Sequence, residues 1–364
     1  MFTQKITLVS VLLVIIIGCS DEQKKHNDII VNQFPITTEL SGHPANTIEA
    51  YSKGHVYLCV ADSFLILLNS HISPAEGRFV SIYSTNTHKL LAKAVTKGRA
   101  PGEFISPTFT GQIEYTHENT HPIVYIYDSG RNRLTLLDVI ETVNNNMHTN
   151  EQILIPQIVY SINSLFYYND SILVATFFPQ PGSQDGRFLI YNDRTKETNV
   201  IPYLPDMGLT FDEAHRFMIY YSFCSVNIEK QYIAASAMQI GEIDYFDLNG
   251  NYIKSTIFDP REKLIEDLQN KVASSDPYIF VSSLKIKDGL LYALNLDNLE
   301  DDLFKTMKFK DISLLVFDLN GKPINKYVFA DNRFVSHFAI DMLHKRIYTF
   351  CANEAEHNII VYDY

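Results

Sequence analysis

The chain has 364 residues, of which 46% are hydrophobic, and its formal net charge is −12 at pH 7. This hydrophobic content is enough to bury a sizeable core, and the 22 Tyr and 23 Phe favour β-strands. The acidic balance argues against a nucleic-acid partner, because binding nucleic acid requires basic patches that replace counterions.

One positive charge, Lys5, precedes an uncharged run from Ile6 to Gly18. This run is shorter than the roughly 20 apolar residues that a membrane-spanning helix needs. A short apolar run after a positive charge is typical of a secretory signal peptide, which is absent from the folded protein. Residues 1–18 are therefore predicted to be a signal peptide.

The run ends Ile16-Ile17-Gly18-Cys19, which resembles the bacterial lipobox. The resemblance implies a lipoprotein signal peptide that is cleaved after Gly18, with lipidation of Cys19 by several acyl chains such as palmitate. Several chains anchor a protein to a membrane far better than one chain does. An ordinary signal peptide and an uncleaved anchor helix remain the alternatives.

Residues 19–28 are polar and have the composition of a flexible tether. Acidic residues just after the lipidated cysteine resemble the surface-export signal of Bacteroidota lipoproteins. This resemblance implies a lipid-anchored protein of the cell envelope at the outer membrane, with the surface face favoured over the periplasmic face.

Residues 29–364 contain six copies of one motif, an apolar run followed by an anchor residue, then Asp, Asn or Ser, and a turn. The anchors are separated by 54, 54, 55, 71 and 45 residues and are Tyr83, Leu137, Tyr191, Phe246, Phe317 and Tyr362. In two copies an Asn-Gly pair predicts a tight hairpin, followed by strands at Asn251–Phe258 and Lys322–Phe329.

A second apolar run precedes most anchors, and these runs are His55–Val60, Ile123–Tyr127, Ile172–Phe177, Tyr232–Ala237, Leu290–Leu294 and Arg346–Cys351. Each unit thus consists of consecutive antiparallel strands joined by hairpins. Four strands in each unit of roughly 50 residues, repeated six times, describe a propeller. We predict an all-β fold: a six-bladed β-propeller of four-stranded antiparallel blades over residues 29–364.

Residues 260–275 lengthen the interval of 71 residues, and apolar residues recur there at helical spacing. This predicts one short helix, which either covers an apolar patch or forms a lid over the central funnel. The last motif stops one residue before the C-terminus, so the final blade lacks an outer strand. We predict that a strand within residues 29–41 fills this gap and protects the open edge.

The segment from Lys97 to Phe104, Lys-Gly-Arg-Ala-Pro-Gly-Glu-Phe, resembles the Gly-Arg-Gly-Pro-Gly-Glu-Phe signature of the six-bladed, TolB-like propeller lipoproteins of Bacteroidota. Ala100 departs from the glycine of that signature. The following repeat, residues 124–134, is similar to an NHL-type blade in its polar positions Asp128, Asn132 and Arg133. The resemblance spans nearly the whole chain and implies a fold and a compartment more than an activity.

The glycines and proline of the signature predict a tight loop between the first two blades. Arg99 and Glu103 of this loop are expected to pair with each other or with Asp128 and Arg133. These four residues form either a structural clamp between blades or a contact with a ligand.

No cofactor, metal site or catalytic residue is predicted. His117 and His121 are spaced for metal binding only on a helix, and Pro122 indicates a loop. The acidic cluster Asp297, Glu300, Asp301 and Asp302 lacks the glycine and the regular spacing of a calcium loop. With Cys19 lipidated, three cysteines remain: Cys59, Cys224 and Cys351. This odd number does not indicate a disulfide framework, but a single disulfide between two of them stays an alternative.

Two functions remain open. The first is a non-catalytic binding or scaffolding propeller at the envelope, whose ligand is an envelope protein, a peptide or a glycan. The second is a hydrolase or lyase that acts on a glycan or a peptide, with residues gathered from several blades at one end of the axis. In either case the functional residues are expected on the loops between strands. The fold alone does not decide between the two functions.

The lipid anchor generates a direct test. Replacing Cys19 with Ala removes the thiol that accepts lipid, so we expect the variant to lose lipid labelling and to leave the membrane fraction. Metabolic labelling with a fatty acid measures this, and continued lipid incorporation would disprove the anchor.

Overall fold

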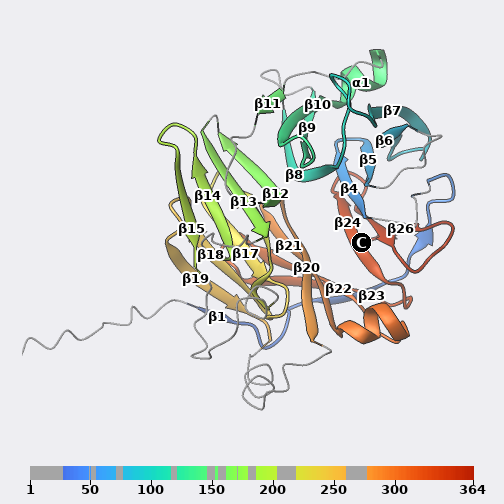
Figure 1. Cartoon of the computed structure of the whole chain (residues 1–364). Helices are drawn as coiled ribbons and strands as arrows, with labels where there is room; N and C mark the ends of the chain where they lie inside the picture. The colour runs from blue at the N-terminus through green and yellow to red at the C-terminus, as the bar shows by residue number, and fades with distance from the viewer. Residues whose placement is uncertain are drawn as a thin grey trace, which may run out of the picture.

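A computed structural model describes residues 28–48, 50, 55–70, 77–115, 121–145, 152–154, 161–169, 171–178, 186–202, 219–259 and 277–364. The strands form six separate sheets placed round a common axis (Figure 1). This arrangement confirms the predicted six-bladed β-propeller.

The first three blades contain four strands each. In order from the axis outward, blade 1 contains β4 (Val56–Ala61), β5 (Phe64–Asn69), β6 (Arg78–Ser84) and β7 (Leu90–Thr96). Blade 2 contains β8 (Pro107–Tyr115), β9 (Pro122–Asp128), β10 (Arg133–Asp138) and β11 (Gln152–Leu154). Blade 3 contains β12 (Ser161–Asn169), β13 (Ile172–Phe178), β14 (Phe188–Asn192) and β15 (Glu197–Ile201).

The other three blades each receive a strand from the N-terminal segment. Blade 4 contains β16 (Ser222–Asn227), β17 (Tyr232–Ala237), β18 (Glu242–Asp247) and β19 (Tyr252–Ile257). Blade 5 contains β20 (Tyr278–Lys287), β21 (Leu290–Leu299), β22 (Ser313–Asp318) and β23 (Pro323–Phe329). Blade 6 contains β24 (Val335–Asp341), β25 (Arg346–Cys351) and β26 (Ile359–Asp363). The described helices are α1 (Val139–Asn145) and the π-helical turn η1 (Asp302–Thr306).

The repeated motif is the third strand of every blade, where its apolar residues are buried on both faces. The strands predicted after the two Asn-Gly turns are β19 and β23. Five of the six preceding runs are second strands, as expected. The run His55–Val60 is the exception, because it contains the innermost strand β4, and the second strand of blade 1 is β5.

Each pair of neighbouring blades shares one hydrophobic cluster, and the last cluster joins blade 6 back to blade 1. In that closing cluster Tyr348 and Val361 of blade 6 pack with Leu58 and Leu67 of blade 1. Every blade therefore buries both faces against neighbours. Since one narrow sheet cannot hide its own apolar faces, the ring stabilises all six blades together.

The N-terminal segment runs along the outside of three blades in succession. Its strand β1 (Ile29–Ile30) pairs in parallel with β19, and β2 (Thr37–Leu40) pairs in parallel with β23. The short strand β3 (His43–Pro44) then pairs antiparallel with β26. We call residues 28–45 the N-terminal strap.

The strap corrects the prediction about ring closure. The N-terminal segment does complete the last blade and joins the two ends of the chain non-covalently, with the Ala45 N–H donating to Ile359 O over 2.9 Å. The prediction that a strand within residues 29–41 does so was wrong. Those residues first cover the exposed edges of blades 4 and 5, so the chain reaches blade 6 only at His43.

Hydrogen bonds to side chains hold the start of the strap and Ala50, which follows its end. The carboxylate of Asp28 accepts the Ser255 N–H over 2.8 Å and the Tyr252 hydroxyl over 3.0 Å. At the other end the buried amide of Asn358 receives the Ala50 N–H over 3.0 Å and donates to the Ala50 carbonyl over 2.7 Å. Asn358 thereby holds Ala50 against blade 6.

Several predictions concern residues that the structure does not describe. The predicted signal peptide, Cys19, nearly all of the tether and the predicted helix at 260–275 lie outside the described residues. In the part of the chain that is described, no helix has the length and apolar character needed to span a membrane.

Gly42 of the strap provides a test of ring closure. A Cβ at this position would lie 2.4 Å from Ile360 Cγ2 and 2.6 Å from Tyr362 Cε1. We expect Gly42→Ala to destabilise the fold by about 1–3 kcal/mol through overpacking, which lowers Tm by roughly 2 °C or more. Calorimetry measures this, with the exposed strap residue Glu39→Ala as the control. Equal melting of the two variants would contradict the role of the strap in closure.

Candidate functional site

The four residues predicted as a clamp or a ligand contact gather where the loop between blades 1 and 2 meets the turn between β9 and β10. Asp128 is fully buried and accepts the N–H groups of Ile105 over 3.1 Å and Ser106 over 2.8 Å. Arg133 donates to the Glu103 carbonyl over 2.7 Å, and its Nη2 lies 3.9 Å from Asp128 Oδ2. Asp128 and Arg133 thus hold the loop by its backbone.

The signature loop is also folded against itself. The Glu103 carboxylate accepts the Ala100 N–H over 2.7 Å, and it lies so close to Gly98 that a Cβ there would be 1.9 Å from Glu103 Oε2. Gly98 also has a φ of 155°. This position therefore requires glycine for two reasons, the backbone conformation and the lack of space for a side chain beside Glu103. Ala100 is not among the residues with positive φ, so the alanine fits its place in the loop.

Arg99 is the only one of the four that is exposed, and it makes no contact with Glu103, Asp128 or Arg133. The guanidinium of Arg133 lies 4.6 Å from the centre of the Phe104 ring, which covers it. A ligand in solvent reaches neither Asp128 nor Arg133. The hydrogen bonds of Asp128 and Arg133 to the loop are those expected of an inter-blade clamp, and this role stays a prediction.

The innermost strands bring together a different set of side chains on the axis. The rings of Tyr57 and His337 meet edge to face with their centres 5.2 Å apart, and His55 lies 6.4 Å from His337. His55 and Tyr57 come from the start of blade 1, and His337 comes from the start of β24. These residues therefore lie at the end of the axis where the inner strands begin, which we call the axial mouth.

Two lysines of β20 cross the axis below the mouth. Lys285 Nζ donates to Leu58 O over 3.0 Å and to Phe338 O over 2.5 Å. Lys287 Nζ donates to Val60 O over 2.8 Å. The two side chains connect blade 5 with blades 1 and 6 through backbone carbonyls.

We define the axial cluster as His55, Tyr57, Lys285, Lys287 and His337, and burial shifts the pKa values of Tyr57, Lys285 and His337. Desolvation lowers the pKa of His337 to about 3, with the positive charge of Lys285 acting in the same direction. Desolvation also lowers the pKa of Lys285 to about 8 and raises the pKa of Tyr57. At neutral pH the cluster thus combines a neutral imidazole, a protonated phenol and a predominantly charged ammonium group.

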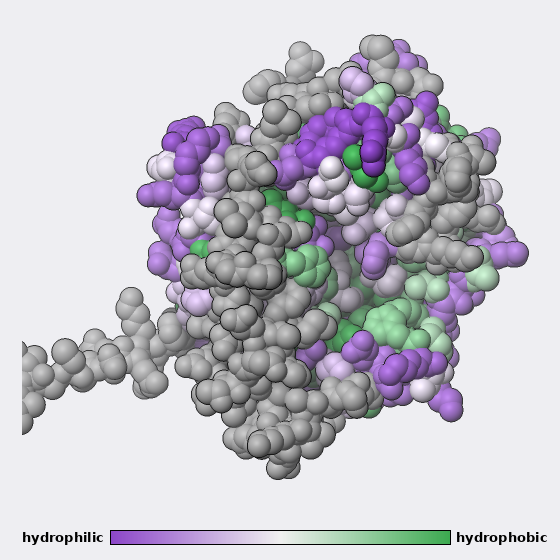
Figure 2. Space-filling model, in the orientation of Figure 1, coloured by the Kyte–Doolittle hydropathy of each residue, from purple (hydrophilic) through white to green (hydrophobic). Residues whose placement is uncertain are grey.

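Aromatic rings from blades 3 and 4 extend the lining of the mouth. Tyr221 stacks on Phe178 with ring centres 5.9 Å apart and meets Phe223 edge to face at 5.5 Å. Burial raises the pKa of Tyr221 to about 12, and the proximity of Tyr57 contributes to this shift. Figure 2, in the orientation of Figure 1, shows a hollow near the centre of the ring with hydrophobic side chains beside it.

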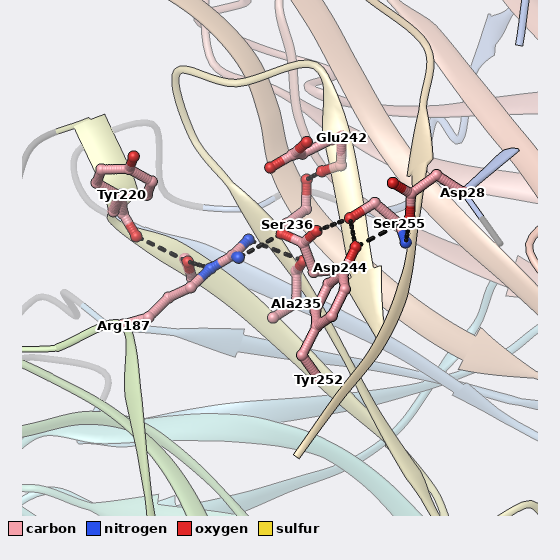
Figure 3. A network of polar contacts seen from close by, with 10 residues as sticks. Asp28, Arg187, Tyr220, Ala235, Ser236, Glu242, Asp244, Tyr252 and Ser255 are labelled. Atoms are coloured by element: carbon pink, nitrogen blue, oxygen red, sulfur yellow. Dashed lines mark hydrogen bonds and ion pairs between the residues drawn. The ribbon is translucent and has the colours of Figure 1, made fainter. Parts of the chain in front are cut away.

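A second polar network lies between blades 3 and 4 (Figure 3). Arg187, at the start of blade 3's third strand, donates to the Asp244 carboxylate, to Ala235 O over 3.0 Å and to Ser222 Oγ over 2.8 Å. Asp244 in turn accepts the hydroxyl of Ser255. The side chain of Arg187 is 0% exposed, so this network joins blades and is closed to a ligand in solvent.

No metal centre emerges from the described residues, which contain no group of three or more His, Cys, Asp or Glu side chains placed to hold an ion. His121 instead lies 3.0 Å from Asp138, and His117 is outside the described residues. In the acidic cluster Asp301 pairs with Lys305 at 2.5 Å. The three described cysteines Cys59, Cys224 and Cys351 are free thiols.

Sequence reasoning did not find the axial cluster. The signal was present as Lys285 and Lys287, two residues apart in an apolar strand, which places both side chains on one face. Recognising it required knowing that β20 is an innermost strand. Whether a strand is innermost depends on how all six blades are arranged round the axis, so it cannot be inferred from one segment of the sequence.

The clamp generates a stability prediction. Asp128→Ala leaves two N–H groups and Arg133 without their buried acceptor, so we expect a loss of about 2–4 kcal/mol in the free energy of unfolding. The exposed neighbour Arg99→Ala is the control and should change stability by less than about 0.5 kcal/mol. Urea unfolding measures both. A larger loss for Arg99→Ala than for Asp128→Ala would contradict the clamp.

Comparison with known proteins agrees with this architecture. The family model described as "TolB-like 6-blade propeller-like" matches residues 45–341. A member of the DUF4221 family from Bacteroides vulgatus is similar in structure, with a TM-score of 0.55, 10% identity, and coverage of 89% of this chain and 95% of that chain. A putative exported protein from Bacteroides fragilis has a TM-score of 0.52 and 12% identity, with coverage of 92% and 97%. No curated protein matches the chain. The chain belongs to the TolB-like six-bladed propeller family.

Proposed function

We propose that this chain is an exported lipoprotein, anchored to the outer membrane through Cys19, whose propeller binds a ligand without catalysis. The ligand class is an envelope protein, a peptide or a glycan, and the site is the axial mouth. The observation that carries this proposal is the axial cluster, in which Tyr57, His337 and Lys285 meet from three different blades.

The lining of the mouth suits binding. Aromatic rings with polar edges give a ligand a large contact area and a defined orientation at low cost in conformational entropy. Tyr57 and Tyr221 offer such rings, and the apolar ring of Phe178, which stacks on Tyr221, keeps 44% of its surface exposed. A concave apolar wall with a few convergent polar groups is the usual chemistry of a small-ligand site.

The pKa values of His337 and Tyr57 favour a role of these two side chains in binding over a role in acid–base catalysis. A general acid–base pair works best with pKa values near the working pH. The pKa of His337 is about 3, and burial raises the pKa of Tyr57, so neither group exchanges protons readily at neutral pH. The two side chains can still donate or accept hydrogen bonds to a ligand.

The proposed membrane anchor is consistent with the strap. Asp28 is the last residue of the proposed tether and is hydrogen-bonded to Ser255 and Tyr252 on the outer strand of blade 4. A lipid on Cys19 would therefore hold the propeller by the edge of blade 4. The axial mouth would stay accessible, because the strap follows the outer edges of blades 4, 5 and 6.

The function is tested by capture from envelope fractions with the full lipidated protein. We expect the wild type to retain a ligand and Tyr57→Ala to retain at least about tenfold less, since a hot-spot aromatic contributes roughly 2 kcal/mol. Tyr364→Ala, which also removes a half-buried tyrosine but away from the mouth, is the control. Equal retention by all three proteins would exclude the mouth as the site. Conversion of the captured ligand into a product would support the hydrolase or lyase alternative.

A further inference from the structure

We propose that the axis of the propeller holds an oxyanion, the carboxylate or phosphate group of a small ligand, between the ammonium groups of Lys285 and Lys287 and the side chains of Tyr57 and His337. This inference rests on the proposed function and names the ligand chemistry of the same mouth. It is carried by the hydrogen-bond geometry of the two lysines.

The two lysines form successive rungs across the axis. Lys285 reaches Leu58 O and Lys287 reaches Val60 O, so both donors and both acceptors are two residues apart on their strands. Strands β20 and β4 therefore face each other in one register and run in the same direction. A two-residue step places the ammonium groups roughly 7 Å apart along the axis, which allows one anion to contact both.

The ammonium groups retain donors that the protein does not use. A lysine ammonium has three N–H groups. Lys285 donates to two carbonyls, which leaves one of its N–H groups without an acceptor among the described residues. Lys287 donates to one carbonyl, which leaves two of its N–H groups without such an acceptor. The Tyr57 hydroxyl likewise has no hydrogen-bond partner in the described part of the chain.

The two lysines have no balancing carboxylate in the part of the chain that the structure describes. Among the described residues, no carboxylate lies within ion-pair distance of either Nζ atom. The Cys59 thiol interacts electrostatically with Lys285, and burial raises the pKa of this thiol, so it stays neutral. Two like charges in a partly desolvated channel are costly, and a bound anion removes that cost.

Overall charge limits the size of the ligand. The protein carries a net charge of −12, so its outer surface repels an extended polyanion. Lys285 and Lys287 place positive charge at the axis, which suits a small ligand or the end of a chain. The rings of Tyr57, His337 and His55 flank this position and suit the faces of a compact cyclic ligand such as a sugar acid or a sugar phosphate.

The test uses the full protein with 13C at lysine Cε, titrated with D-glucuronate, D-glucose 6-phosphate and D-glucose. The first two probes carry a carboxylate and a phosphate on the same sugar ring, and the third is the neutral control. The signals of Lys285 and Lys287 are assigned from their absence in the spectra of Lys285→Met and Lys287→Met. We expect both signals to shift with at least one anionic probe and not with D-glucose. The probe that binds more tightly identifies the oxyanion.

The variants decide whether the axis is the site. Lys285→Met should weaken the binding of that probe at least about tenfold, equivalent to 1.4 kcal/mol. Lys322→Met, which removes an exposed lysine from the turn between β22 and β23, should leave affinity unchanged. Methionine keeps the length of the side chain, and an unchanged Tm verifies folding. Failure of both anionic probes to shift the two lysine signals at millimolar concentration would overturn the proposal, as would equal affinity of Lys285→Met and the wild type.

The two proposals fail in different ways. If an anion binds Lys285 and Lys287 but capture from the envelope does not depend on Tyr57, the anion site stands and the proposed function fails. If capture depends on Tyr57 and neither anionic probe binds, the proposed function stands and the oxyanion is wrong.

Discussion

Burial of both faces of each narrow sheet is the constraint on which this structure depends. Every blade contributes to two hydrophobic clusters, one with each neighbour, and the sixth cluster joins the two ends of the ring. No blade can be removed without exposing two apolar surfaces to water. The strap serves the same purpose at the outer edges, where it pairs with β19, β23 and β26.

Closure of the ring has a chemical consequence at the axis. Six inner strands converge there, and the polar side chains that they carry meet residues from blades distant in sequence. Lys285 of blade 5 thus donates to Leu58, 227 positions earlier in the chain. Its charge is tolerated because backbone carbonyls and the Phe338 ring, 4.9 Å from Nζ, surround it.

The accessibility of the polar groups separates those that connect neighbouring blades from those of the candidate site. Arg187 and Asp128 are fully buried and make hydrogen bonds to the neighbouring blade or loop, so their role is to hold blades together. Tyr57, His337 and Lys285 are only partly buried, and Lys285 keeps one N–H group without an acceptor among the described residues. Charged and polar side chains therefore hold parts of the ring together where they are fully buried, and they are available to bind a ligand at the axis.

The sequence by itself determined the number of blades, the third strand of each and the clamp loop, because hydrophobic period and turn chemistry are local properties of the chain. It located the loop around Asp128 and Arg133 without deciding between clamp and ligand contact, since burial is a tertiary property. It misplaced the closing strand, because residues 29–41 read equally well as an outer strand of any blade. Only the tertiary structure decided that His43 closes the ring and that Lys285, Tyr57 and His337 meet, because side chains from three blades become neighbours only when the ring is complete.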